Sequence, residues 1–341
     1  MKYKSCDSLE NNWMVFNGAF DRGLNTLGFC CGDNARKISV ELSQDPEETW
    51  KRYQEMKNKI INESIQTAKT GKPSKNEFYH ACYSCSSFHE NTDWPQGAEV
   101  QIAYIDIGAG PSPCNAKCFY CSSMLEDRRK YDAQSDAPHN ELIFKHIQYY
   151  KDKGLFAKNI YWGVGAGEIT VHPFREKIYK IIGTSQATWM SNCYLYSEEI
   201  AENLEANPKS TILTSLDAGS PKTWNKIKGA DNFIQVKENI KNYAKNAQTK
   251  GNQISLKYII LPGINDDMKN TNNFIQFAAE IGAKCITLAM DRGKPFTDAH
   301  LKAATLLSSF AVKNKMEVEC IFIPDEFRKQ IAENALLINL H

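Results

Sequence analysis

The feature that most limits the possible folds of this chain is the alternation of apolar and amphipathic segments from about residue 99 onward. Short apolar runs recur there and are separated by stretches whose apolar residues have helical spacing. The runs are VQIAYIDI (100–107), KNIYWGV (158–164), ATWMS (187–191), TILTSL (211–216), ISLKYIIL (254–261), CITLAM (285–290) and EVECIFI (317–323). Such alternation predicts an α/β fold with parallel strands. Six or seven such units fit a partial (β/α)6-type, TIM-like barrel better than a short doubly wound sheet.

Residues 1–98 lack this alternation. One long helix is predicted for DPEETWKRYQEMKNKIINESIQTAKTG, with Asp45 as its N-cap and Gly71 as its stop signal. The stretches around it are rich in Gly, Asn and Cys and cannot bury much core, so a bound metal cluster would supply the missing constraint. We therefore expect a small cysteine-rich α+β module over 1–98, the partial barrel over 99–323, and a C-terminal helix or tail over 324–341.

Charge and hydropathy exclude some classes of partner. The chain carries 41 Lys and Arg against 40 Asp and Glu, a formal net charge of +1, which gives no electrostatic footprint for nucleic acid or an acidic membrane surface. The N-terminal segment MKYKSCDSLENNW has no apolar stretch of the kind found in a signal peptide. The sequence also contains no run of about 18 apolar residues, the length that predicts a transmembrane helix. We expect a soluble, cytoplasmic protein with no nucleic-acid or membrane partner.

The chain has 11 cysteines, and they are unevenly distributed. Most of them lie in the first third of the chain, whereas a core that used cysteine as a small hydrophobe would scatter them. In a reducing compartment, clustered thiols are more often metal ligands than disulfides. The early cysteines are Cys6, Cys30, Cys31, Cys82 and Cys85, followed by a triplet at 114–121.

The triplet is Cys114, Cys118 and Cys121 in the segment CNAKCFYC. It directly follows the first apolar run, at the carboxyl end of the predicted strand, where active sites of parallel β/α folds collect. Three thiolates on one loop can hold three irons of a cubane cluster and leave the fourth iron free. A structural zinc site would need a fourth ligand. The nearest downstream histidines, His139 and His146, belong to a separate helical segment.

The segment CNAKCFYC resembles the cluster loop of the radical S-adenosylmethionine (SAM) superfamily, because an aromatic residue, Tyr120, precedes the last cysteine of a C-x3-C-x2-C motif. The resemblance implies that the three cysteines hold a 4Fe–4S cluster whose open iron binds SAM. Reductive cleavage of SAM would then give a 5′-deoxyadenosyl radical that abstracts hydrogen from a substrate. It also implies an external one-electron donor such as flavodoxin or ferredoxin.

Further segments extend the resemblance over about residues 99–323. GVGAGE, after the second predicted strand, is similar to the family's glycine-rich element that contacts the methionyl amino group, although an alanine interrupts the glycines. SLD, after the fourth, is similar to the family's Ser-x-Asp region near the SAM ribose and carboxylate, although these two polar residues also suit a helix entry. The resemblance thus implies SAM contacts by Tyr120, Gly165, Gly167, Glu168, Ser215 and Asp217.

The early cysteines resemble a SPASM or twitch auxiliary-cluster module, in which a cysteine is followed by a hairpin-like segment, Cys-Cys-Gly, a helix and CxxC. The resemblance implies a second 4Fe–4S cluster held by Cys6, Cys30, Cys82 and Cys85, with Cys31 as the alternative to Cys30. In familiar relatives the module follows the barrel, whereas here it precedes it. A zinc knuckle and a reversible disulfide remain alternatives for these thiols.

The sequence predicts a radical SAM enzyme that abstracts hydrogen from a peptide or small-molecule substrate, with oxidation or cross-linking as the outcome. One alternative is a redox-neutral epimerase in which Cys193, after the third predicted strand, donates a hydrogen atom to the substrate radical. A small buried thiol is the structural alternative for that residue. An iron–sulfur electron carrier that never cleaves SAM is an alternative from a different class.

Overall fold

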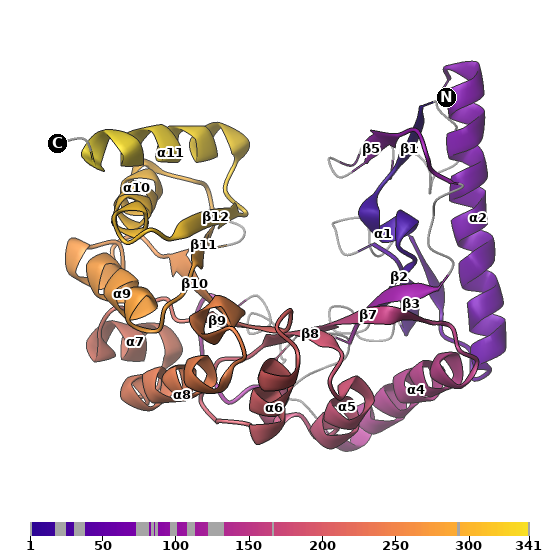
Figure 1. Ribbon diagram of the computed structural model, residues 1–341, viewed down its shortest axis with the longest axis horizontal. Helices are drawn as coiled ribbons and strands as arrows, with labels where there is room; N and C mark the ends of the chain where they lie inside the picture. The colour runs from indigo at the N-terminus through magenta and orange to yellow at the C-terminus, as the bar shows by residue number, and fades with distance from the viewer. Residues whose placement is uncertain are drawn as a thin grey trace. The chain divides into compact units, whose positions relative to one another are not determined.

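The computed structural model describes most of the chain and divides it into two compact units. The residues described are 2–17, 25–30, 38–72, 82, 85, 88–95, 101–107, 113–121, 133–165, 167–291 and 294–339. The first unit comprises Met1–Ser112 and Tyr131–Ala166, and the second comprises Pro113–Lys130 and Gly167–His341. Figure 1 labels the elements of both units.

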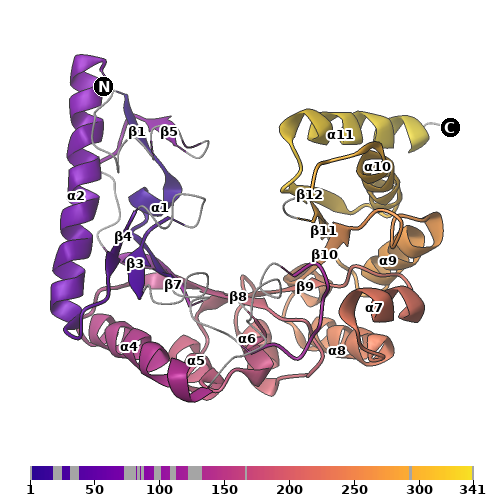
Figure 2. The same cartoon turned by 180° about the vertical axis from the view of Figure 1, so that it is seen from behind.

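The first unit combines strands from both ends of its sequence with two long helices. Its strands are β1 (Tyr3–Ser5), β2 (Trp13–Asn17), β3 (Thr26–Gly28), β4 (Ser39–Glu41), β5 (His89–Asn91), β6 (Ile102–Asp106) and β7 (Phe156–Val164). Its helices are α1 (Asp7–Glu10), α2 (Pro46–Thr70) and α4 (Ala133–Asp152). β7, β6 and β2 run parallel, β3 and β4 continue the sheet in antiparallel fashion, and β1 pairs with β5. Figure 2 shows α2 running alongside β3 and β4.

Helix α2 has the ends that the sequence predicts. The Asp45 side chain accepts a hydrogen bond from the Glu47 N–H at 3.0 Å, and Pro46 occupies the first helical turn, where a missing N–H costs nothing. Gly71 ends the helix with a φ of +67°, a conformation that glycine adopts without strain. The apolar face, which includes Tyr53 and Ile60, is buried.

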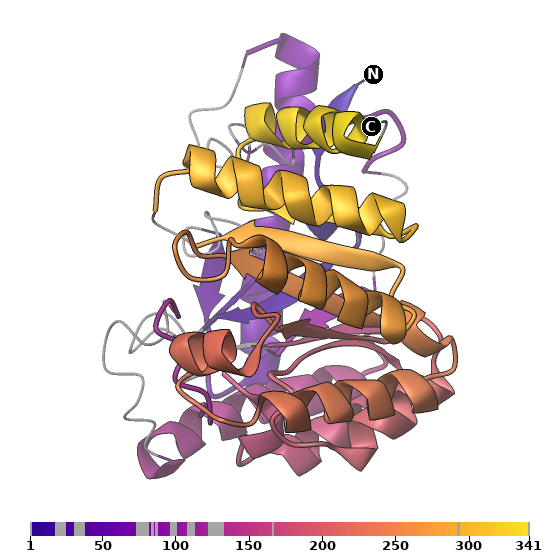
Figure 3. The same cartoon turned by 90° about the vertical axis from the view of Figure 1, so that its left-hand side faces the viewer.

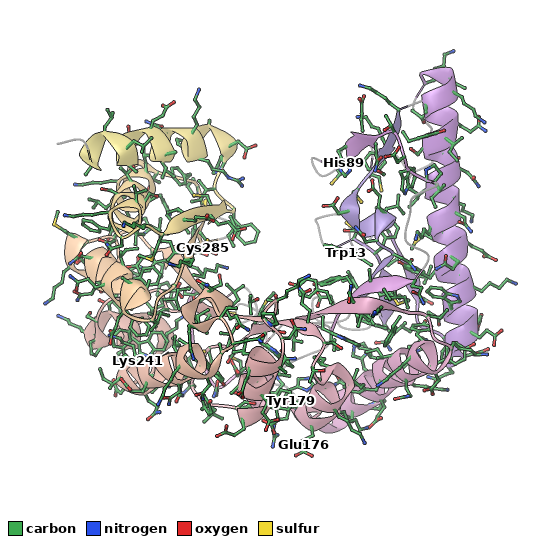
Figure 4. All side chains as sticks on the ribbon, viewed as in Figure 1. Trp13, His89, Glu176, Tyr179, Lys241 and Cys285 are labelled. Carbon is green, nitrogen blue, oxygen red and sulfur yellow. The ribbon has the colours of Figure 1, made fainter. Side chains whose placement is uncertain are left out.

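The compact units do not follow the expected boundary near residue 98. β6 pairs in parallel with β2, with Trp13 opposite Tyr104 and Met14 opposite Ile105. Met14 and Ile105 are both fully buried, so this pairing gives the N-terminal strand a core to share. The Trp13 ring, labelled in Figure 4, contacts the ring of Tyr104 at a centroid distance of 4.4 Å. The first two strands of the expected barrel therefore belong to the first unit.

The second unit is a parallel α/β unit. Its strands are β8 (Gln186–Met190), β9 (Thr211–Ser215), β10 (Ile254–Ile260), β11 (Cys285–Met290) and β12 (Glu317–Ile321), paired in that order. Its helices are η2 (Ile169–Val171), α5 (Arg175–Ile182), α6 (Glu198–Ala206), α7 (Pro221–Lys228), α8 (Phe233–Asn246), η3 (Lys250–Gln253), α9 (Met268–Glu280), α10 (Asp298–Lys313) and α11 (Asp325–Asn339). Every pairing described in this unit is parallel.

The helices α8, α9 and α10 lie in a row along these strands (Figure 3). On their outer side, Lys241 of α8 forms an ion pair with Glu280 of α9 at 2.8 Å (Figure 4). All the strands expected between residues 100 and 323 are present, and the predicted α/β class is confirmed. Among the described helices, none combines the length and the hydropathy that a membrane crossing requires.

His172, which follows η2, makes the stability of the protein depend on pH. It is 6% exposed, its Nδ1 accepts a hydrogen bond from the Phe174 N–H at 3.1 Å, and burial lowers its pKa from 6.5 to about 4. Between these values the unfolded chain binds a proton that the folded protein does not. The stabilisation is therefore complete above pH 6.5 and is lost as the pH falls towards 4.

Replacing His172 by Asn, which keeps an acceptor for Phe174, should flatten this pH dependence. We expect the urea-unfolding free energies of the wild type and the variant to diverge by roughly 1.4 kcal/mol per pH unit between pH 6.5 and 4, and by about 3 kcal/mol in total at most. Titrations at pH 7, 6 and 5 measure the difference. Parallel pH profiles of the two proteins would contradict the assignment.

Candidate functional site

The three thiols of CNAKCFYC lie on a short loop of the second unit. The Cys114 thiol interacts electrostatically with those of Cys118 and Cys121, and the Cys121 N–H donates to the Cys118 carbonyl at 3.2 Å. Burial, aided by the Glu168 carboxylate and the neighbouring thiols, raises the pKa of Cys114 to about 11, against the opposing effect of the Ala116 N–H. Partly buried thiolates that repel each other are the donor set that a metal cluster stabilises.

The end of α7 anchors this loop. The N–H groups of Lys117 and Phe119 donate to the carbonyls of Lys228 and Ile227, at 3.1 and 3.2 Å. Carbonyls in the last turn of a helix have no partner within the helix. These bonds therefore satisfy the helix carbonyls and the N–H groups of the loop at the same time. Gly229 ends α7 with a φ of +63°, and a Cβ there would lie 3.3 Å from that of Lys117. The two neighbours of Cys118 are thus fixed to the helix terminus.

Glu168 links the first end of the loop to η2 and to the residues that follow β8. Its N–H donates to the Pro113 carbonyl at 2.9 Å. Its carboxylate is fully buried and accepts bonds from the N–H and hydroxyl of Thr170, from the Ser191 hydroxyl at 2.9 Å and from the Asn192 N–H at 2.6 Å. Burial raises the pKa of Glu168, while these donors act in the opposite direction.

Asn192 is a site residue that the sequence analysis missed. Its Nδ2 donates to the Asn115 side chain at 2.7 Å and lies 3.8 Å from the Cys114 sulfur. It follows β8 directly, and that position at a strand exit was the available signal. The amide therefore positions the first cysteine of the loop.

The other end of the loop rests on a buried ion pair. Lys228 Nζ lies 2.6 Å from Asp217 Oδ2 and 2.6 Å from the Tyr120 hydroxyl, which itself donates to Asp217. The other Asp217 oxygen accepts the Ile259 N–H at 2.7 Å. Asp217 and Lys228 are 0% and 3% exposed. The sequence analysis assigned no role to Lys228, because a lysine in the last turn of a helix is ordinarily solvated.

The remaining predicted residues of this site differ in exposure. Gly167 is exposed with a φ of +71°, and Ser215 is half-buried at the end of β9. Gly165 directly follows β7 in the first unit. Cys193 is 0% exposed, and burial raises its pKa to about 12. The structure gives no support to Cys193 as a hydrogen donor, and that role stays a prediction.

Four thiols also come together within the first unit. The Cys6 thiol interacts electrostatically with those of Cys30 and Cys85, and the Cys82 thiol interacts with all three. Burial raises the pKa of Cys6 to about 11 and that of Cys82 to about 12. Cys31, the alternative ligand, lies outside the described residues. The assignment of this set to a second cluster stays a prediction.

Short strands bring these thiols together. β1 and β5 pair with Ser5 opposite His89, so Cys6, which follows Ser5, lies at the same end as the chain that leads from Cys85. The Phe88 N–H donates to the Cys85 carbonyl at 3.1 Å, which continues that approach. Cys6 is also the N-cap of α1: the Leu9 and Glu10 N–H groups donate to its carbonyl, at 3.0 and 2.9 Å, and the Leu9 and Ser8 N–H groups oppose the rise that burial causes in the pKa of its thiol. Amide donors at a helix N-terminus favour a thiolate.

A side-chain cluster braces the same turn. Ligand atoms of Asp7, Glu10 and His89 lie within 4.8 Å of one another. His89 Nε2 is 3.3 Å from Glu10 Oε1, which also accepts from Asn91 Nδ2 at 3.0 Å. His89, labelled in Figure 4, thus ties β5 to α1. The contact helps to hold Cys6 at the helix N-terminus.

These observations define an α/β protein with a three-thiol loop held against the carboxyl ends of parallel strands. Residues 113–275 match the family model of the Radical SAM superfamily, a match that spans just under half of the chain. A domain of that family uses a 4Fe–4S cluster and SAM as its cofactors. A search of curated proteins gave no match.

A comparison with solved structures matched several radical SAM proteins at low sequence identity. SuiB of Streptococcus suis bound to SAM is 11% identical, with a TM-score of 0.48, and the match covers 82% of this chain and 60% of SuiB. A radical SAM methyltransferase of Sphaerobacter thermophilus is 13% identical, with a TM-score of 0.43 and coverage of 61% and 63%. A domain of the pyruvate-formate lyase-activating enzyme of Bacteroides vulgatus is 16% identical, with a TM-score of 0.38 and coverage of 47% and 97%.

Replacing Glu168 by Gln tests whether its carboxylate holds the strand exits together. One oxygen must become an NH2 group, which would point at donors such as the Asn192 N–H, so the variant should lose about 1–3 kcal/mol of unfolding free energy. Urea unfolding of the metal-free protein measures the loss. Glu205→Gln, at an exposed position of α6, is the matched control and should change stability by less than about 0.5 kcal/mol. Equal stabilities of the two variants would refute the bracing role.

Proposed function

We propose that this enzyme cleaves SAM reductively and uses the resulting radical to abstract hydrogen from a carbon of a peptide or small-molecule substrate. Oxidation or cross-linking of that substrate follows. The observation that carries the proposal is the three-thiol loop, whose backbone N–H groups at Lys117 and Phe119 are bonded to the end of α7. These bonds hold the backbone on both sides of Cys118.

The residues of the loop fit a cluster with one open position. Cys114 is exposed, and Cys118 and Cys121 are half-buried, so the donor set has an accessible side. These three thiols would hold the cluster, and the Asn192 amide lies beside the first of them. When bound, the cluster passes one electron to SAM for its cleavage. The cluster receives that electron from an external flavodoxin or ferredoxin.

The carboxyl ends of the strands would bind SAM itself. Gly167 keeps exposed backbone there, and Ser215 keeps a half-buried hydroxyl at the end of β9. Glu168 and Asp217 are occupied by protein donors, so we propose that they position the loops that contact SAM. Tyr120 would contribute through its ring, since its hydroxyl is bonded to Asp217.

We further propose that Cys6, Cys30, Cys82 and Cys85 hold an auxiliary 4Fe–4S cluster. Four thiols satisfy a cubane completely, which distinguishes this set from the three-thiol loop. Their mutual electrostatic interactions raise the pKa of Cys82 in addition to burial, so a bound cationic cluster would relieve a repulsion that the free thiolates suffer. An auxiliary cluster of this kind can accept an electron from a substrate radical, which suits a net oxidation.

Cleavage of SAM can be measured without knowing the substrate. After anaerobic reconstitution, the wild-type protein with dithionite and SAM should form 5′-deoxyadenosine. The variant Cys114→Ala, Cys118→Ala, Cys121→Ala should form none above a protein-free blank. A fully iron-loaded wild type that forms no 5′-deoxyadenosine would favour an iron–sulfur electron carrier.

Iron content tests the two cysteine sets separately. The reconstituted wild type should contain roughly eight iron atoms per chain, four for each cubane, and Cys82→Ala with Cys85→Ala should contain about four. Cys285→Ala with Cys320→Ala, in β11 and β12, is the matched control and should keep all the iron. A wild type that contains about four iron atoms and one zinc per chain would contradict the auxiliary cluster and indicate a zinc site in its place.

A further inference from the structure

The buried cation beside the cysteine loop has a role that the fold alone does not require. Lys228 is 3% exposed, and its Nζ lies 2.6 Å from both Asp217 and the Tyr120 hydroxyl. The ammonium also lies 5.1 Å from the centre of the Tyr120 ring and 5.5 Å from that of Trp224. Burying a charge is costly even when it is paired, and apolar residues of similar volume often replace such pairs without loss of stability.

The backbone places this cation at one cysteine of the three. Lys117 and Phe119, the neighbours of Cys118, are bonded to the carbonyls of Lys228 and Ile227. Burial raises the pKa of the Cys118 thiol, and the Lys228 ammonium acts in the opposite direction. The residue that carries the ammonium is thus bonded, through its own carbonyl and that of Ile227, to both neighbours of Cys118.

We propose that Lys228 sets the reduction potential of the cluster on Cys114, Cys118 and Cys121, with Asp217 keeping its ammonium charged and in place. This inference rests on the proposed function, in which Cys118 is a cluster ligand. Lys228 acts through Cys118 and is a positioning residue. The step concerned is the entry of one electron from the external donor into the cluster, with no bond made or broken and no proton moved.

The direction of the effect follows from charge. Reduction adds one negative charge to the cluster, and a fixed positive charge in a weakly polar site stabilises that added charge. The ammonium of Lys228 therefore makes the cluster easier to reduce. Lys226, two residues earlier on α7, is exposed, so water and salt screen its charge.

An EPR-monitored redox titration of the reconstituted full-length protein tests the proposal. The signal to follow is the one that added SAM perturbs, which separates this cluster from the auxiliary one. At a fixed solution potential, Lys228→Met and Lys228→Gln should each lower the ratio of reduced to oxidised cluster about tenfold, which is 59 mV for one electron. Lys226→Met, with the same change in net charge, should leave the ratio unchanged, and Lys228→Arg should stay within about threefold of the wild type.

Each contrary outcome has a distinct meaning. An unchanged ratio in Lys228→Met and Lys228→Gln, with iron content equal to the wild type, would overturn this inference and leave the proposed function standing. Loss of the cluster in all three Lys228 variants would also overturn it, because the residue would then be a structural anchor of the loop. A wild type without any SAM-perturbed signal would overturn the proposed function and this inference with it.

Discussion

The pairing of the cysteine loop with the end of α7 is the contact on which the rest of the site depends. Phe119 and Cys114 of this loop are exposed, so packing alone does not fix the three sulfurs. The Ile227 and Lys228 carbonyls, unpaired within the helix, supply the fixed acceptors instead. Ile227 and Ile259 share a buried cluster on which Tyr120 packs. The acceptor carbonyls therefore belong to closely packed backbone, which restricts the motion of the loop that is bonded to them.

Two buried carboxylates do comparable work at neighbouring strand ends. Glu168 collects donors from Thr170, Ser191 and Asn192, and a carboxylate is the natural collector because it accepts several bonds and donates none. Asp217 accepts the Ile259 N–H, the Lys228 ammonium and the Tyr120 hydroxyl. In both cases the cost of burying a charge is offset by charge-assisted bonds, and the side chain holds protein groups in place.

The sequence was enough to predict the strands of the α/β region from their alternation with helices, and the ends of α2 from Asp45 and Gly71. Partners far apart in sequence were not predictable in the same way. Lys228 and Tyr120 are separated by 108 residues, and nothing in either segment shows that the lysine is buried. The parallel pairing of β2 with β6 escaped for a similar reason, since alternation shows which residues are buried but not which strand lies alongside.

The order of segments along the chain gives the cysteine loop an unusual folding problem. Pro113–Lys130 belongs to the second unit, although the segments on both sides of it belong to the first. Its anchors, Glu168 and the end of α7, come later in the sequence, so the site requires long-range contacts that form slowly. A cluster bound to the three thiols would stabilise the folded loop by mass action. Metal loading and the ordering of this loop are therefore coupled. Both depend on the formation of α7, because its last carbonyls are the acceptors for the loop.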